Sequence, residues 1–272
     1  MPARSAGAPY CHFEHVRKLH VAHHFDRADT VDFDYRRFIS RAPAPFRAAV
    51  LAAEWALIPA VELLMHARTA LSPLLGGVGA ARRASAAVGT LAVVSLHACL
   101  LLQGGPKALA LYFLATLLFL HTLSLHDAFQ HTYEVAFASD GAYVPGPGKR
   151  TAQYEEENTY SDLLSTRWPW VNLLTLNFGY HNAHHRKPMT PWYRLPALHA
   201  ATYGDALADG GKGVPSVERC PQLLPVRNLA GTWFRNRLRR VLEEDYGVVA
   251  KGTGADRAAA FIGSLGVSFL TV

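Results

Sequence analysis

Histidine is the residue type most able to do chemistry in this chain, because its 14 copies gather in clusters. The pattern H-x-x-H-H occurs twice, at residues 20–24 and 181–185. Positions i, i+3 and i+4 of a helix share one face, so each copy can aim two or three imidazoles at one point. Imidazole suits zinc, copper, iron and nickel. The two copies therefore predict one shared metal site, whose ligands are His20, His23, His24, His181, His184 and His185.

A third cluster, at residues 126–131, supplies further candidates. Asp127 and His131 are four residues apart and share a helical face, so His131 is the favoured seventh ligand. Asp127 could be a ligand, hold a water molecule or position a ligand. His126 lies about 140° from His131 around a helix, and it remains either a ligand or a bystander. Weaker candidates for the site or its surroundings are His12, His15 and Asn182.

So many neutral nitrogen ligands can hold two redox-active metals, and iron bound in this way can reduce O₂ and attack a C–H bond. A zinc hydrolase needs only three protein ligands and one open position, so the number of imidazoles exceeds its requirement. The cysteines, Cys11, Cys99 and Cys220, form no C-x-x-C pair, which argues against a thiolate zinc site. A non-catalytic metal-binding membrane protein, such as a zinc or nickel handler, stays open as an alternative.

Two apolar blocks, residues 86–103 and 108–125, are long enough to cross a bilayer, which takes about 17–25 residues. A segment rich in helix breakers, residues 103–107, separates them. The blocks therefore predict a transmembrane hairpin over residues 86–125. Buried helices of a soluble bundle are the alternative, but the run 109–120 lacks the polar face that a soluble helix would show.

Residues 46–68 predict a single amphipathic helix in the plane of the membrane interface. Arg47, Glu54, Glu62 and His66 would line one polar stripe of this helix, with leucine and isoleucine side chains between them. Two membrane passes, rather than three, bring the histidine clusters to the same face of the membrane. Arginine and lysine flank the hairpin on both sides, which places the clusters on the cytoplasmic side.

The remaining segments complete an organisation in which a histidine-rich cap lies above the membrane. We expect residues 1–45 to form a cytoplasmic segment, residues 126–226 the catalytic cap and residues 227–272 a basic amphipathic tail. The acidic triplet at residues 155–157 is interpreted as a solvated loop. The net charge of +6 comes with no aromatic-and-basic nucleic-acid motif, so a membrane is the expected partner and nucleic acid is not. The predicted fold class is all-α, an integral-membrane helical bundle with a histidine-rich cytoplasmic cap.

These motifs resemble those of the integral-membrane fatty acid desaturase superfamily over residues 12–200. Residues 20–24 resemble its second histidine box, residues 177–185 its third box, and residues 191–196 the continuation of that box. His131, with Asp127 before it, is similar to an additional ligand site of the family. The resemblance implies a centre of two Fe ions, O₂ as co-substrate, a lipid acyl chain as substrate and a separate electron-donor protein of the ferredoxin, rubredoxin or cytochrome b5 type. A hydroxylase, a monooxygenase and a carotenoid ketolase of the same superfamily stay open.

The sequence departs from the family pattern at the first histidine box, H-x(3,4)-H, and at the membrane hairpin that precedes it. Either a segment upstream of Met1 carries both, or His12 and His15 stand in for the first box; we favour the first explanation. A chain without the first box would bind metal incompletely and would be inactive.

Overall fold

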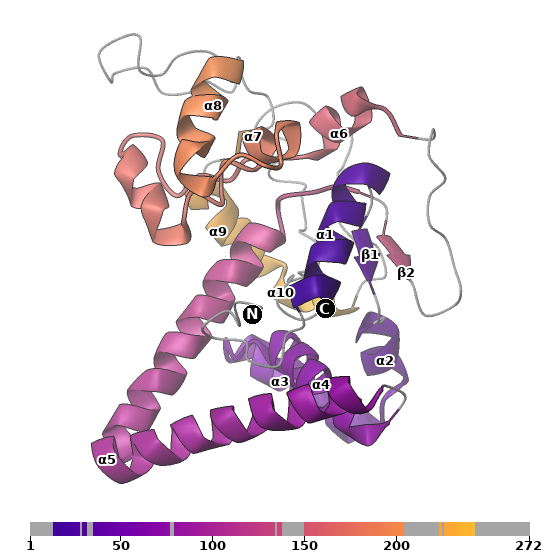
Figure 1. Cartoon of the computed structure of the whole chain (residues 1–272), viewed down its shortest axis with the longest axis vertical. Helices are drawn as coiled ribbons and strands as arrows, with labels where there is room; N and C mark the ends of the chain where they lie inside the picture. Colours follow the sequence, from indigo (N-terminus) through magenta and orange to yellow (C-terminus); the bar gives the residue numbers. More distant parts are fainter. Residues whose placement is uncertain are drawn as a thin grey trace.

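Helices make up most of the described part of the chain (Figure 1), which confirms the predicted all-α class. One small addition was not predicted. Strands β1 (Asp29–Val31) and β2 (Val135–Phe137) form a parallel ladder in which Asp29 pairs with Val135. At three residues each, they are too short for an alternating pattern to reveal them. The computed structural model describes residues 13–27, 29–31, 35–76, 79–133, 135–137, 150–203, 223–224 and 226–242.

The predicted hairpin corresponds to α5 (Ala80–Asp127), a helix of 48 residues that bends sharply at Gly105. Gly105 has a φ of 72°, a left-handed conformation that glycine adopts readily, and Pro106 follows it. Figure 1 shows two limbs that diverge from this corner, so the hairpin is an open V. At about 1.5 Å per residue, each limb is long enough for a hydrocarbon layer of ~30 Å. Within the described residues, α5 is the one helix whose length and apolar composition suit a membrane span, and residues 44–75 make a second candidate only if their two bent helices are taken together.

The prediction of one helix over residues 46–68 is wrong. The structure has two helices there, α3 (Ala44–Trp55) and α4 (Ala60–Leu75), whose axes differ by 119°. Pro59 immediately precedes α4, and a proline ring inside a helix clashes with the carbonyl group four residues earlier. The break ends the continuous polar stripe that the sequence suggested.

The glutamates of that predicted stripe hold helices together inside the molecule. Glu62 is buried and its Oε1 atom accepts a hydrogen bond of 2.6 Å from the hydroxyl of Ser124 on α5. Glu54 accepts a hydrogen bond of 2.9 Å from the backbone N–H of Val61, which ties α3 to the start of α4. His66, also placed on that stripe, is half-buried.

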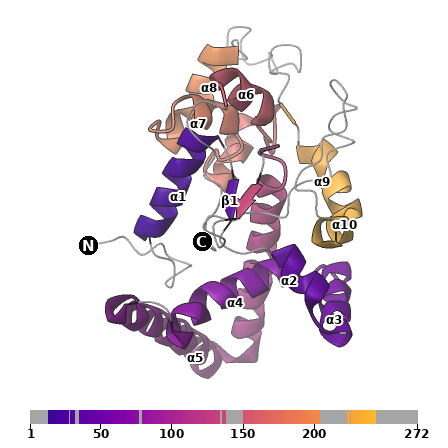
Figure 2. The same cartoon turned by 90° about the vertical axis from the view of Figure 1, so that its right-hand side faces the viewer.

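A helical cap lies at the upper end of the second limb of α5 in Figures 1 and 2. Figure 2 shows α1 alongside α7 in this cap, although about 160 residues separate the two histidine clusters that they carry. The core of the cap beneath α7 includes Leu163, Tyr180 and Ala183. The elements of the cap are α1 (Phe13–Asp26), α6 (Ala152–Asn158), η2 (Pro169–Thr175), α7 (His181–Arg186), η3 (Trp192–Arg194) and α8 (Leu195–Tyr203).

The described part of the C-terminal tail docks on the rest of the molecule. It forms two short helices, α9 (Val226–Arg235) and α10 (Arg237–Leu242). Arg237 donates a hydrogen bond to the carbonyl oxygen of Glu54, and Val241 is buried in a core shared with α2 (Tyr35–Arg41) and α4. Residues 243–272 of the predicted tail lie outside the described residues.

Candidate metal centre

All seven histidines favoured from the sequence come together between α1, α7 and the segment after α5. They form two groups, and within each group one ring nitrogen per residue lies within 4.8 Å of the others. That these residues bind metal stays a prediction; their convergence is a geometric fact. The four-histidine group consists of His23, His131, His181 and His185, and the three-histidine group of His20, His24 and His184.

Each histidine box divides its residues between the two groups. On α1, His20 and His24 are one helical turn apart and join the three-histidine group, whereas His23 joins the other group. On α7 the division is reversed, because His181 and His185 join the four-histidine group and His184 joins the other. Each box therefore gives two histidines to one group and one histidine to the other group. Neither group is complete without both helices.

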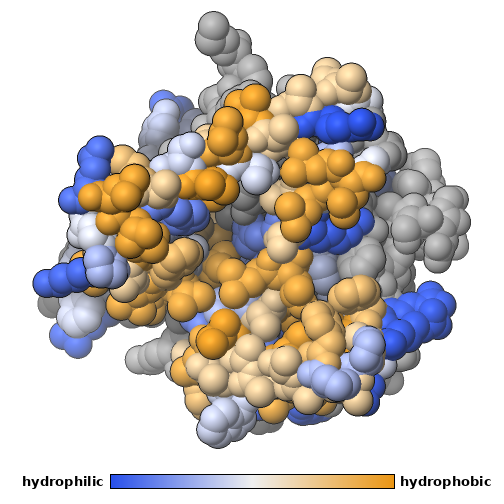
Figure 3. Space-filling view, turned by 90° about the horizontal axis from the view of Figure 1, so that it is seen from below, coloured by the Kyte–Doolittle hydropathy of each residue, from blue (hydrophilic) through white to orange (hydrophobic). Residues whose placement is uncertain are grey.

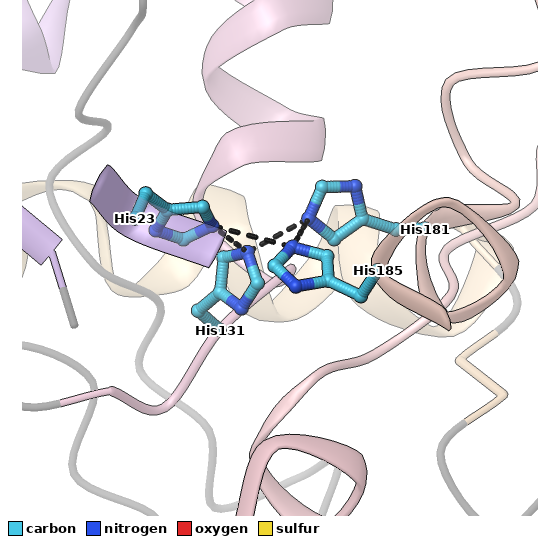
Figure 4. Close-up of side chains that lie close together, drawn as sticks. All are labelled: His23, His131, His181 and His185. Carbon is cyan, nitrogen blue, oxygen red and sulfur yellow. Dashed lines mark hydrogen bonds between the residues drawn. The ribbon is translucent and has the colours of Figure 1, made fainter. Parts of the chain in front are cut away.

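The Nε2 atoms of the four-histidine group form a closed ring of contacts, and Figure 4 shows the four imidazoles pointing toward one another. A neutral imidazole has a single N–H, so the ring contacts leave lone pairs facing each other. A cation that accepts all four lone pairs removes this conflict, since nitrogens about 2.1 Å from one ion lie about 3–3.5 Å apart. The distances around the ring are 3.1 Å (His23–His131), 2.7 Å (His131–His181), 3.1 Å (His181–His185) and 3.2 Å (His185–His23).

The three-histidine group has similar spacing but lies closer to the surface. Its Nε2 atoms are separated by 3.2 Å (His20–His184), 3.2 Å (His20–His24) and 3.0 Å (His24–His184), and its side chains are half-buried. The ring centroids of His24 and His185, one from each group, are 4.2 Å apart. The groups are therefore adjacent and suit a pair of metal ions.

Burial and neighbouring imidazoles favour the neutral form of most of these histidines, because they lower the pKa of those side chains. Burial, followed by repulsion from His23, lowers the pKa of His20 to about 4. Burial, followed by repulsion from His20, also lowers the pKa of His184 to about 4. In the four-histidine group, burial and the neighbouring imidazoles hold the pKa of His131 and of His181 well below the usual value. Neutral lone pairs are the form that a metal ion requires.

The interpretation of residues 155–157 as a solvated loop is wrong. They lie on α6, whose first turn is capped by the hydroxyl of Thr151. The Oε1 atom of Glu155 lies 3.0 Å from Nδ1 of His185, and its Oε2 atom accepts a hydrogen bond of 2.9 Å from Nε of Arg27. Such a carboxylate fixes the proton on Nδ1 and turns the Nε2 lone pair of His185 toward its group. Glu155 is 30 residues before His185, and no local spacing in the sequence reveals the contact.

His126, left open as a ligand or a bystander, belongs to neither histidine group. Its Nδ1 atom lies 2.9 Å from Oδ2 of Asp162, and both side chains are buried. Asp127 also lies outside the two groups and lines a neighbouring cavity. The structure therefore separates the end of α5 from the histidines that converge.

Asn182, a candidate for the surroundings of the site, holds α7 in place. Its side-chain amide donates to the carbonyl oxygen of Thr159, and its Oδ1 atom accepts a hydrogen bond of 2.8 Å from Ser161. The backbone of His15 lies within α1, but its side chain and the whole of His12 lie outside the described residues.

Gly179 lets the chain approach α7 closely. The backbone N–H of Asp162 donates a 3.0 Å hydrogen bond to the carbonyl oxygen of Gly179. A Cβ atom at residue 179 would lie 2.7 Å from the carbonyl oxygen of Asp162, closer than real Cβ contacts. A larger residue would therefore push apart two segments that position His181.

An apolar cavity of about 820 Å³ lies beside the metal centre, within the size range of small-molecule sites. Its walls come from the second limb of α5, from η2 and from the chain on either side of α7. Phe178 lines it, and the ring of Phe178 lies 5.6 Å from that of His181 in the four-histidine group. The cavity therefore ends one side chain away from the candidate metal site.

The fold and the site together define a helical protein with a histidine centre suited to metal ions, placed at the end of a long apolar hairpin. The chain belongs to the fatty acid desaturase family, because the model of that family matches residues 3–214. Membership places it with membrane-associated oxidoreductases. No curated protein and no solved structure matched the chain significantly.

Proposed function

We propose that this protein is an O₂-dependent di-iron desaturase that acts on the acyl chain of a membrane lipid. The observation that carries the proposal is the convergence of seven imidazoles in two adjacent groups. Family membership supports the reaction class. The nitrogen-only ligand set suits iron and leaves more ligands than a mononuclear zinc hydrolase uses.

The histidine groups would each hold one iron ion, and the bound irons would activate O₂, the oxidant that removes two hydrogens from the acyl chain and is reduced to water with two electrons from the donor protein. The protein contributes rigidity around them. Glu155 orients His185, and Arg27 holds the Glu155 carboxylate in turn. Burial of His131 and His181 keeps water away from the deeper group.

The apolar cavity would hold the acyl chain. Phe119, Leu123 and Leu174 offer it an apolar wall, and Phe178 separates it from His181. Because these side chains exclude water and restrict the chain to one path, they would decide which carbon lies nearest the metal centre. Electrons would come from a separate ferredoxin, rubredoxin or cytochrome b5 type protein, and the cap would lie on the cytoplasmic side of the membrane.

Product analysis tests the proposal. Membranes that contain the protein, an electron donor and O₂ should yield lipids with one additional double bond, detected by mass spectrometry as the loss of two hydrogens. His184→Ala should abolish the product, whereas His97→Gln, outside both groups, should retain it. An added oxygen atom would identify a hydroxylase or monooxygenase instead. Zinc without iron in protein purified from iron-rich cells, together with unchanged lipids, would support a metal-handling protein.

A further inference from the structure

The segment around η2 exposes an unusual amount of apolar surface next to the cavity. Leu174 is 78% exposed and Trp170 is 66% exposed. No charged residue occurs between Arg167 and Arg186. Large exposed apolar patches mark surfaces that meet a protein, a ligand or a membrane. We call this surface the aromatic rim; it consists of Trp168, Trp170, Leu173, Leu174, Leu176 and Trp192.

The aromatic rim is held in a defined shape. Asn172 is buried, and its side-chain amide donates a 2.8 Å hydrogen bond to the carbonyl oxygen of Ser165 while its Oδ1 atom accepts from the backbone N–H of Ser165. Asn177 donates a 3.2 Å hydrogen bond to the carbonyl oxygen of Trp192. Because these bonds satisfy polar groups inside the loop, its apolar side chains project outward.

The side chains that flank the aromatic rim are of the kind found at a membrane interface. The guanidinium group of Arg167 lies 4.9 Å from the ring of Trp168, and that of Arg194 lies 6.0 Å from the ring of Tyr193. Tryptophan and tyrosine collect at the level of lipid headgroups, and arginine can reach from there to phosphate. An acidic partner protein would instead call for a charged surface.

The aromatic rim is also continuous with the apolar surface of α5. Leu174 and Leu176 line the cavity together with Phe119 and Leu123 of α5, and Phe119 is 55% exposed. Seen from below, much of the molecule is covered by apolar side chains around a hollow (Figure 3). The same leucines thus belong to the outer apolar surface and to the cavity wall.

We infer that the aromatic rim inserts into the bilayer interface and that the cavity opens sideways to the lipid, so that an acyl chain enters from the membrane between η2 and α5. The entry route rests on the proposed function, since it assigns a lipid chain to the cavity. Insertion of the aromatic rim depends neither on metal nor on catalysis.

Spin labels at single cysteines test insertion in vesicles of phosphatidylcholine and phosphatidylglycerol. In a background with Cys11, Cys99 and Cys220 changed to serine, Leu174→Cys should collide more with O₂ than with a water-soluble nickel complex. Leu111→Cys on α5 is the lipid-facing reference, and Gln153→Cys on α6 the aqueous one. A label at residue 174 that behaves like the label at residue 153 would overturn the proposal, whether or not residue 111 lies in lipid.

Photocrosslinking tests the entry route without any need for turnover. A phosphatidylcholine that carries a diazirine on its acyl chain should label Thr122 and Leu164, which line the cavity, as well as Leu111 on the outer surface. Thr175→Phe should fill the cavity and lower labelling inside it by about tenfold, while labelling at Leu111 stays unchanged. Circular dichroism and metal content would confirm that this variant folds. Absent cavity labelling, or equal labelling in both proteins, would contradict sideways entry.

Discussion

The two histidine groups are built from the same two helices but differ in depth and in number of ligands. The four-histidine group is buried and draws His131 from the segment after α5 in addition to α1 and α7. The three-histidine group is half-buried and draws on α1 and α7 alone. A buried set of four imidazoles suits tight, permanent metal binding, whereas the shallower set leaves more of its metal open to other molecules. We therefore expect that an ion in the four-histidine group would anchor the cap, and that an ion in the three-histidine group would be lost more easily.

The largest expected effect on metal binding comes from replacing His131, the one candidate ligand that lies outside both histidine boxes. His131→Ala should weaken metal binding at the four-histidine group by more than about 100-fold, because loss of a direct ligand exceeds the ~10–100-fold cost of losing an outer partner. Iron content measured by mass spectrometry should fall by at least one ion per chain. Full iron content in this variant would show that the four-histidine group does not need His131 to bind metal.

His184→Ala should empty only the shallow group. The remaining pair, His20 and His24, cannot hold an ion tightly, but the four-histidine group keeps all its members. Half of the iron should therefore remain, and activity should be lost. Loss of all the iron would show that the groups bind their ions as one unit.

Glu155→Gln should produce a smaller effect, on the orientation of His185. The amide can still meet Nδ1 but carries no charge, so metal affinity should fall by about 10–100-fold. Competition with a chelator measures this change, and Glu157→Gln, on the exposed side of α6, is the matched control. Equal metal affinities in the two variants would show that Glu155 does not support metal binding.

Acid should destabilise the metal-free protein. Unfolded histidine has a pKa near 6.5, whereas burial lowers the pKa of His20 and His184 to about 4, so between these values the unfolded chain binds more protons. Above pH 6.5 these two imidazoles do not lower the free energy of unfolding, and below pH 6.5 they lower it progressively as the pH falls toward 4. Denaturant unfolding in detergent at several pH values measures the slope, and His184→Gln should make it shallower. A flat profile would contradict the burial of these imidazoles.

The smallest expected effect concerns packing near His181. Gly179→Ala should lower the free energy of unfolding by about 1–3 kcal/mol, since its Cβ atom would crowd the carbonyl oxygen of Asp162. Thermal unfolding measures the loss. Gly231→Ala, where a Cβ atom would have ordinary contacts on α9, is a control that should change little.

The sequence revealed most of the candidate site because the i, i+3, i+4 spacing of its histidines is local. The same spacing could not reveal that each box divides its histidines between the two groups, since this depends on how α1 packs beside α7. Glu155 was missed for a similar reason, as its contact with His185 is made only in three dimensions.

The apolar hairpin could also be predicted, because Gly105 and Pro106 interrupt a long hydrophobic run. Pro59 signals the break before α4, but the amphipathic pattern continues through residues 46–68 on both sides of it and predicts one helix. Burial of Glu62 could not be foreseen, since its partner Ser124 lies on a distant helix.

Whether two metal ions occupy the two histidine groups, as we propose, is tested most directly by the iron content and the Mössbauer spectrum of the purified protein. We expect two iron ions per chain and two distinct signals of equal area, of which His184→Ala removes one. A single signal from one iron ion per chain, or a zinc-filled centre in protein from iron-rich cells, would contradict it.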